Sequence, residues 1–221
     1  MNNFTKSFLL GSAIAVSSCA STNSFLAERQ QVVEYYRIFN LPDSQLGRDT
    51  VINAARDGIA KSGVKVADTR PIPPRYKPAE PGRFVPVNPL AGSPMAALAG
   101  QSAAILKTAS CEGAVWTAQT TRSVGSDNAR LSFCIWEYQG GYSIDIYGNY
   151  ILKEGGLSLE RVAKAITDPL VGDFEKTLER LVNDVAREVQ NASRVHIAYV
   201  EGYPEPSGES WWTQSHTITS K

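Results

Sequence analysis

The sequence is poor in the residues from which catalytic and metal sites are usually built. Its 221 residues include only two histidines and three cysteines. The phosphate-, dinucleotide-, zinc- and serine-hydrolase motifs G-x-x-x-x-G-K, G-x-G-x-x-G, H-E-x-x-H and G-x-S-x-G do not occur. A serine-histidine-aspartate arrangement would have to use His196, with Asp145 to orient it, although lone histidines on strands are usually structural. We therefore expect no enzymatic activity, no metal and no other cofactor.

An excess of positive charge is also missing. The 22 lysines and arginines are balanced by 22 aspartates and glutamates, and no basic stripe is visible, so nucleic-acid binding has no electrostatic support. After residue 18, glycine, proline or charged residues interrupt every apolar run. No later segment is therefore predicted to span a membrane as a helix.

Residues 1–19 carry the most specific signal in the sequence. Lys6 provides a positive charge, and the apolar run Phe8–Val16 is too short to span a bilayer. The tetrapeptide Val16-Ser17-Ser18-Cys19 follows. This arrangement resembles the signal peptide and lipobox of bacterial lipoproteins.

The resemblance implies that residues 1–18 are removed and that Cys19 carries acyl chains, such as palmitate, as the new N-terminus. Ala20 and Ser21 follow the cysteine, with no aspartate, which by the same resemblance indicates the outer membrane and its periplasmic face. Two other interpretations remain open. One is ordinary secretion with cleavage after Ala20, and the other is a cytosolic start with a chance apolar run.

The other two cysteines form an even pair. In an oxidising compartment, Cys111 and Cys134 are expected to form a disulfide across 134 − 111 = 23 positions. The alternatives are two buried free thiols or, less favoured, a metal site without further ligands at suitable spacing. A strand pairing turned within Gly125–Asp127 places Cys134 opposite about Thr117 to Gln119. Either Cys111 must fold back from the start of its strand to reach it, or the turn must be irregular.

Residues 19–69 are predicted to contain a tether and a small β-α-β unit. The β-branched and aromatic residues in the second half of Phe25–Phe39 favour a strand. A helix capped by Asp49 or Thr50 is expected to end at Gly63, and a strand follows at Val64 and Val66.

Residues 70–94 form a proline-rich connector. They hold eight of the 12 prolines, which can neither donate to a sheet ladder nor continue a helix. The segment is therefore predicted to be extended and largely polyproline II.

Residues 95–203 are predicted to form the main domain, followed by a polar tail over 204–221. Three antiparallel strands are expected over 113–152, with a hairpin turn at Gly140-Gly141 that pairs Ile135 with Ile146. Alternation places one set of apolar residues on a common face: Leu131, Phe133, Ile135, Ile144 and Ile146.

Two helices and a strand complete the main domain. A short helix is predicted from Ser158, and Asp168-Pro169 starts a longer amphipathic helix. The last strand is expected over Ser193–Val200. The order indicates an α+β fold, an antiparallel sheet of about four strands covered on one face by two helices, with the N-terminal β-α-β unit and proline-rich connector.

The opposite face of this sheet is predicted to be aromatic. It carries Trp136, Tyr138 and Tyr147, together with Trp116 if the loop at Gly125 has an odd number of residues. Such a face is too apolar to remain in water. Either the chain covers it with its own proline-rich stretch or tail, or it contacts a partner.

The same two interpretations apply to Trp211 and Trp212 in the tail. For the face itself, we predict that part of Pro71–Pro89 crosses it, because polyproline II docks on aromatic surfaces at low entropic cost.

These features predict an outer-membrane lipoprotein that acts as a non-catalytic accessory or assembly component of an envelope complex. Its expected partners are the membrane, through the lipid, and an envelope protein. The alternatives are a glycan-binding module that uses the tryptophans, or an envelope hydrolase.

Overall fold

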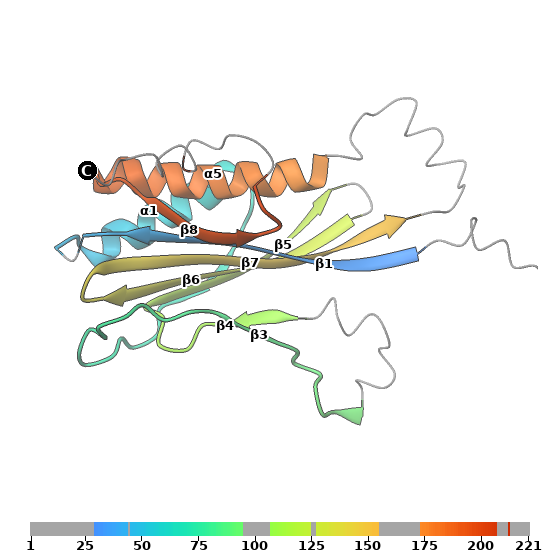
Figure 1. Cartoon of the computed structure of the whole chain (residues 1–221), viewed down its shortest axis with the longest axis horizontal. Coiled ribbons are helices and arrows are strands. Elements are labelled where there is room, and N and C mark those ends of the chain that lie inside the picture. Colours follow the sequence, from blue (N-terminus) through green and yellow to red (C-terminus); the bar gives the residue numbers. More distant parts are fainter. Residues whose placement is uncertain are drawn as a thin grey trace, which may run out of the picture.

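A six-stranded antiparallel sheet is the centre of the fold, as seen in a computed structural model (Figure 1). The structure describes residues 29–43, 45–94, 107–124, 127–154, 173–206 and 212. The strands lie in the order β2-β5-β6-β7-β1-β8. Their bounds are β1 (Arg29–Leu41), β2 (Ala67–Thr69), β5 (Trp116–Val124), β6 (Asp127–Tyr138), β7 (Gly141–Glu154) and β8 (Ala198–Tyr203).

The sheet has more strands than the predicted four, because β1 and β2 belong to it. Strand β1 lies between β7 and β8, and β2 pairs with β5. The apolar residues of β1 alternate between both faces, with Tyr35 and Phe39 toward the main core and Ile38 toward the other side. A strand with buried residues on both faces fits a central position, so the segment predicted as a separate β-α-β unit is hydrogen-bonded into the main sheet.

The β6–β7 hairpin has the predicted faces but a different register. Ile135 pairs with Ile144, not with Ile146, because Tyr138 and Gly141 enclose the turn. The register thus differs from the prediction by two residues. An even shift leaves each side chain on the same face, and the predicted apolar set lies in the main core.

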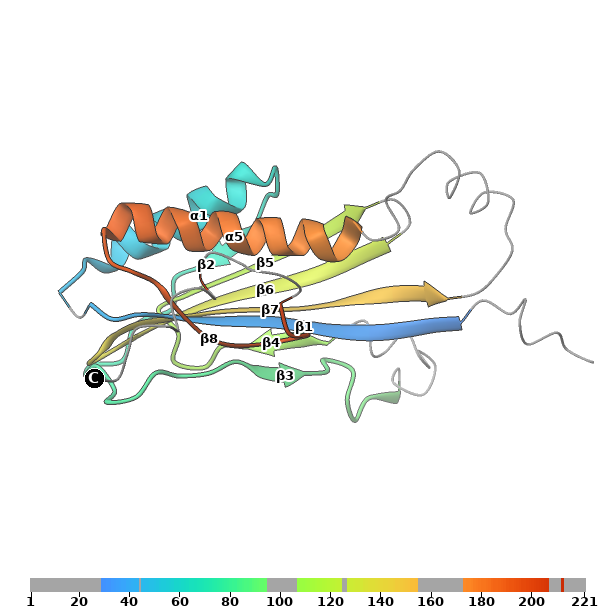
Figure 2. The same ribbon diagram turned by 45° about the horizontal axis from the view of Figure 1, so that its top comes forward.

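Two helices cover one face of the sheet in the part of the chain that the structure describes: α1 (Arg48–Lys61) and α5 (Asp173–Ser193) (Figures 1 and 2). Helix α1 begins one residue before the predicted cap, with Gly47 at the N-cap. Its predicted stop is confirmed by Gly63, which has a φ of 70°. The helices pack closely, because a Cβ on Gly58 would lie 2.5 Å from Val185 Cα.

Helix α5 buries one side and exposes or half-exposes the other, as its apolar spacing predicts. Its buried residues are Leu178, Leu181, Val182, Val185, Ala186 and Val189. The predicted start at Asp168-Pro169 and the predicted helix from Ser158 lie outside the described residues. The last strand begins later than expected, because α5 continues to Ser193 and β8 starts only at Ala198.

A third layer covers the other face of the sheet. It contains the two-stranded ribbon of β3 (Val85–Val87) and β4 (Thr108–Ser110) (Figure 1). The predicted disulfide joins this layer to β6: Cys111 and Cys134 are bonded, with Cα atoms 5.7 Å apart. Cys134 pairs with Thr117 as predicted. In the chain-entropy model, a loop of this length contributes roughly 3 kcal/mol.

Candidate functional site

The proline-rich segment crosses the aromatic face of the sheet, as predicted. We call residues 77–87 the strap. At one end the Gln139 backbone N–H donates to the Pro78 carbonyl at 2.9 Å. Further along, Gly82 lies against the Trp136 indole so closely that a Cβ on Gly82 would be 2.3 Å from its Nε1. This contact leaves no room for a side chain at position 82.

Trp136 is the centre of a small second core beneath the strap. Its side chain is 2% exposed, and its Nε1 donates to the Glu112 carbonyl at 2.9 Å. The other buried members of this core are Ala109, Ala114, Cys134 and Tyr147. The protein therefore covers much of its aromatic face with its own strap and ribbon.

Phe84 fixes the middle of the strap. Its ring centroid lies 5.0 Å from that of Tyr147 and 5.5 Å from that of Tyr36. Its backbone N–H donates to Asp145 Oδ2 at 3.3 Å. A buried carboxylate on β7 thus accepts a hydrogen bond from the strap.

Asp145 is fully buried, at 0% exposure. Burial raises its pKa to about 6 from an ordinary value of 3.8. Hydrogen bonds from Ser143 and the Phe84 N–H and the charge of Arg83 act in the opposite direction, while the charge of Glu201 adds to the rise. Since the folded state favours the protonated acid, this group stabilises the fold most below about pH 4, and that contribution is lost as the pH rises to about 6.

Replacing Asp145 by asparagine tests this burial. The wild type should gain free energy of unfolding relative to Asp145→Asn as the pH falls from 7 to 4, by about 3 kcal/mol for a shift of roughly two pKa units. Chemical denaturation of both proteins across this range measures the difference. Asp49→Asn is the matched control, because Asp49 is 78% exposed. A difference in free energy of unfolding between wild type and Asp145→Asn that does not change with pH would contradict the prediction.

A shallow cleft of about 270 Å³ lies between the strap and the sheet. It is lined by Glu34, Tyr36, Arg83, Phe84, Pro86, Tyr147 and Glu201. Arg83 pairs with Glu201, and Lys107 Nζ lies 2.6 Å from Glu34 Oε1. Aromatic walls with charged groups suit a ligand that has a flat apolar face and hydrogen-bonding groups at its edge.

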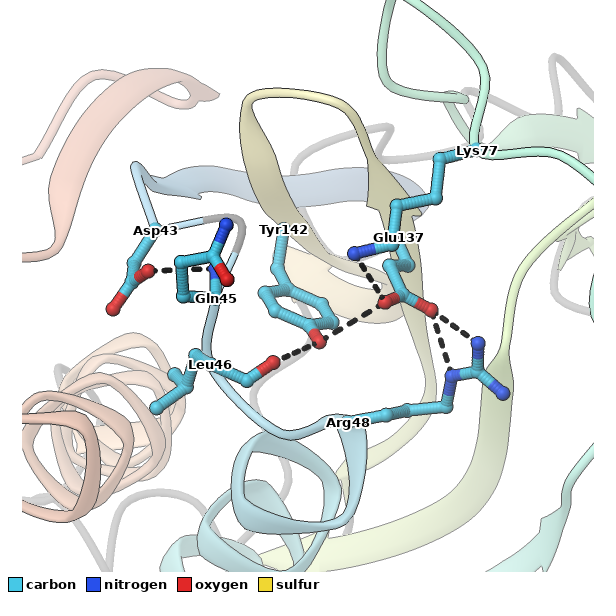
Figure 3. A network of polar contacts seen from close by, with 7 residues as sticks. All are labelled: Asp43, Gln45, Leu46, Arg48, Lys77, Glu137 and Tyr142. Carbon is cyan, nitrogen blue, oxygen red and sulfur yellow. Dashed lines mark hydrogen bonds and ion pairs between the residues drawn. The ribbon is translucent and has the colours of Figure 1, made fainter.

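Glu137 joins the strap to the helix layer (Figure 3). One carboxylate contacts Arg48 at the start of α1, with Nε 2.8 Å from Oε2, and Lys77 of the strap, with Nζ 2.9 Å from Oε1. The Tyr142 hydroxyl donates to the Leu46 carbonyl at 2.7 Å and also contacts Glu137 at 3.3 Å. The end of the β6–β7 hairpin therefore holds both outer layers.

The charges around this carboxylate set its protonation. Burial acts to raise the pKa of Glu137, but hydrogen bonds from Lys77 and Arg48 and their positive charges lower it overall. Burial, together with the negative charge of Glu137, raises the pKa of Tyr142 to about 12. Glu137 is thus ionised and Tyr142 neutral near neutral pH.

A buried ion pair between sheet and helix was not predicted from the sequence. Arg37 of β1 is 0% exposed and pairs with Glu179 of α5, while its Nη1 donates to the Tyr36 carbonyl at 2.8 Å. Its guanidinium lies over the Tyr35 ring, 4.5 Å from the centroid. The arginine inside a strand of β-branched and aromatic residues indicated a buried charge. Its partner Glu179 could not be identified from the sequence, because it lies 142 positions away.

The structure separates the predicted aromatic residues. Trp116 lies in the main core, on the face opposite Trp136, because the two-residue loop between Val124 and Asp127 has even length. Trp212 is also buried in the main core, 5.5 Å from Phe39 between ring centroids. Tyr138 donates to Asn40 Oδ1 at 2.8 Å. Trp211 and Cys19 lie outside the described residues.

Burial limits what these side chains can contact. Trp116, Trp136, Tyr147 and Trp212 are each at most 2% exposed, so they are not surface anchors in this conformation. His196 is exposed in the loop before β8, whereas the buried Asp145 is hydrogen-bonded to Ser143 and Phe84.

No protein-family model matches this chain, and no curated protein matches it significantly. Among the described residues, no helix is both long and apolar enough to cross a membrane. In that same part of the chain, no group of three or more histidine, cysteine, aspartate or glutamate side chains is arranged to hold a metal ion.

Proposed function

We propose that this protein is a lipid-anchored component of the bacterial outer membrane that acts without catalysis in the assembly of an envelope complex. The structural observation that carries the proposal is the disulfide between Cys111 and Cys134, which joins the ribbon layer to the sheet. Structural disulfides are typical of oxidising compartments. This agrees with the lipobox at Cys19, which implies export.

The position of β1 relates this anchor to the domain. Arg29, the first residue of β1, lies ten positions after Cys19, and this stretch spans at most about 35 Å when extended. Arg29 pairs with Glu154, so the start of β1 and the end of β7 lie at the same end of the sheet. The proposal places this end toward the bilayer and the β6–β7 hairpin away from it.

Replacing Cys19 by serine tests the anchor. Cys19→Ser should yield an uncleaved or soluble form, because several acyl chains at about 0.8 kcal/mol per buried methylene hold a protein durably on a bilayer. Metabolic labelling with a fatty acid and membrane fractionation measure the effect. Thr22→Ala, which leaves the lipobox intact, should remain labelled. A mature wild-type protein that carries no label would contradict the proposal.

A second candidate function is glycan binding in the strap cleft. The observation that favours it is the combination of the Tyr36 and Phe84 rings with Glu34 and Glu201 at one cleft. Saturable binding of N-acetylglucosamine oligomers, abolished by Tyr36→Ala, would distinguish glycan binding from the assembly role.

A further inference from the structure

The part of the proline-rich segment that precedes the strap does not pack on the sheet. We call residues 70–76 the arch, with the sequence Arg-Pro-Ile-Pro-Pro-Arg-Tyr. Ile72 is 96% exposed and Tyr76 is 81% exposed, the highest values among the large hydrophobic residues of the described chain. Single exposed apolar residues are common on protein surfaces, but here two occur within five positions of a segment rich in proline.

Proline fixes the backbone of the arch. Pro71, Pro73 and Pro74 have φ near −65°, and a residue that precedes proline is restricted to extended or polyproline II conformations. The only cis peptide bond in the described ranges is Tyr203–Pro204, so the arch prolines follow trans bonds. With three residues per turn, Pro71 and Pro74 would share one edge of a polyproline II helix. The chain bends after this stretch, at Arg75 and Tyr76.

Both ends of the arch are held in place. On the β2 side, Thr69 pairs with Thr117 in the sheet, and the Oγ1 atoms of the two threonines lie 2.7 Å apart. On the strap side, Lys77 pairs with Glu137, and Pro78 accepts the hydrogen bond from Gln139. A segment that is fixed at both ends and by proline within loses little conformational entropy when it binds.

The arch lies far from the proposed anchor point. Thr69 pairs with Thr117, and Trp116 at the start of β5 pairs with Ile135, toward the β6–β7 hairpin. Strand β1 has 13 residues, about 43 Å of strand at 3.3 Å per residue. Figure 1 shows the start of β1 and this hairpin at opposite ends of the sheet. This placement favours a protein partner over the lipid surface.

We propose that the arch is a docking segment for an envelope protein, and that it binds as a polyproline II ligand in a groove lined by aromatic side chains and flanked by carboxylates. Proline-rich segments dock in aromatic grooves in this way. Arg70 and Arg75 supply positive charge near both ends of the apolar stretch. The contact between Arg70 and Asp49 is exposed and contributes little, so a partner carboxylate can replace it. This inference rests on the proposed assembly role and names the class of partner.

Photocrosslinking in the native cells tests the arch directly. The photoreactive residue p-benzoylphenylalanine is placed at Ile72 or Tyr76 of the full chain, and at Tyr203 on β8, which is 55% exposed, as a comparison surface. We expect one discrete protein adduct from both arch positions. Mass spectrometry should map the crosslinked peptide of the partner to a segment with aromatic and acidic side chains.

A double variant tests the polyproline conformation. With the crosslinker at Tyr76, Pro71→Ala/Pro74→Ala should reduce the adduct yield about tenfold, because the unbound segment gains conformational freedom. Pro89→Ala is the matched control and should leave the yield unchanged. Equal denaturation midpoints confirm that the fold of each variant is intact.

The possible results separate this inference from the proposed function. Adducts at Tyr203 alone would overturn the arch as the docking segment and leave the assembly role in place. Adducts with lipid at Ile72 and Tyr76 would overturn the protein partner. A yield unaffected by the double variant would overturn polyproline II recognition, and no adducts at any position would contradict both the inference and the assembly role.

Discussion

Replacing Trp136 by alanine is expected to lower the free energy of unfolding by about 3–5 kcal/mol and to release the strap. The indole is 2% exposed, contacts Gly82 and donates to the Glu112 carbonyl, so its removal leaves a cavity beneath the strap and loses this hydrogen bond. Chemical denaturation measures the loss of stability. Tryptic cleavage after Arg83 measures the release of the strap, because the Phe84 N–H that follows is hydrogen-bonded to Asp145.

Trp136→Phe is the matched control for this experiment. It keeps most of the apolar volume and loses the hydrogen bond to Glu112, so we expect a cost of about 1 kcal/mol and slow cleavage after Arg83. Rapid cleavage at that bond in the wild type would contradict a docked strap. Unchanged stability of Trp136→Ala would contradict the burial of the indole.

The second large effect is expected at the ion pair of Arg37 and Glu179. Arg37→Met should cost about 3 kcal/mol, because breaking a buried pair leaves one charge without its partner. The value lies at the lower end of the usual range, since Glu179 is 17% exposed. Thermal or chemical denaturation of the single variant measures this loss.

The double variant Arg37→Met/Glu179→Leu separates the ion pair from simple packing. With both charges removed, an apolar pair of similar volume should restore stability to within about 1 kcal/mol of the wild type. A double variant as unstable as Arg37→Met would mean that the methylene groups and packing of Arg37 matter more than its charge.

The sequence predicted the side chains that share a face better than it predicted pairing. Alternation placed Leu131 and Ile146 correctly, because their faces survive an even shift of register. The register itself depended on the role of each glycine at 140–141. Gly141 lies beyond the turn, where a Cβ would be 2.0 Å from the Leu41 carbonyl oxygen. This constraint comes from β1, which lies about a hundred positions away and is invisible to local turn rules.

Loop parity and long-range charge explain the other differences. The face of Trp116 depended on whether the loop at Gly125 had an odd or even length, a quantity that local composition does not fix. Arg37 could be recognised as a charge in an apolar strand. Its partner on α5 could not be predicted without knowing how that helix packs on the sheet. The docking of the strap was predictable because it followed from the apolar character of one whole sheet face.

The central place of β1 has a mechanical consequence. The chain enters the described fold at Arg29, and β1 pairs with β7 along its whole length, from Arg29 opposite Glu154 to Leu41 opposite Tyr142. Interstrand hydrogen bonds run perpendicular to antiparallel strands. A pull on the chain before Arg29, directed along β1, therefore loads this row of bonds in parallel as shear and does not open them one by one. A domain that hangs from its N-terminus would in this way resist extraction of its first strand.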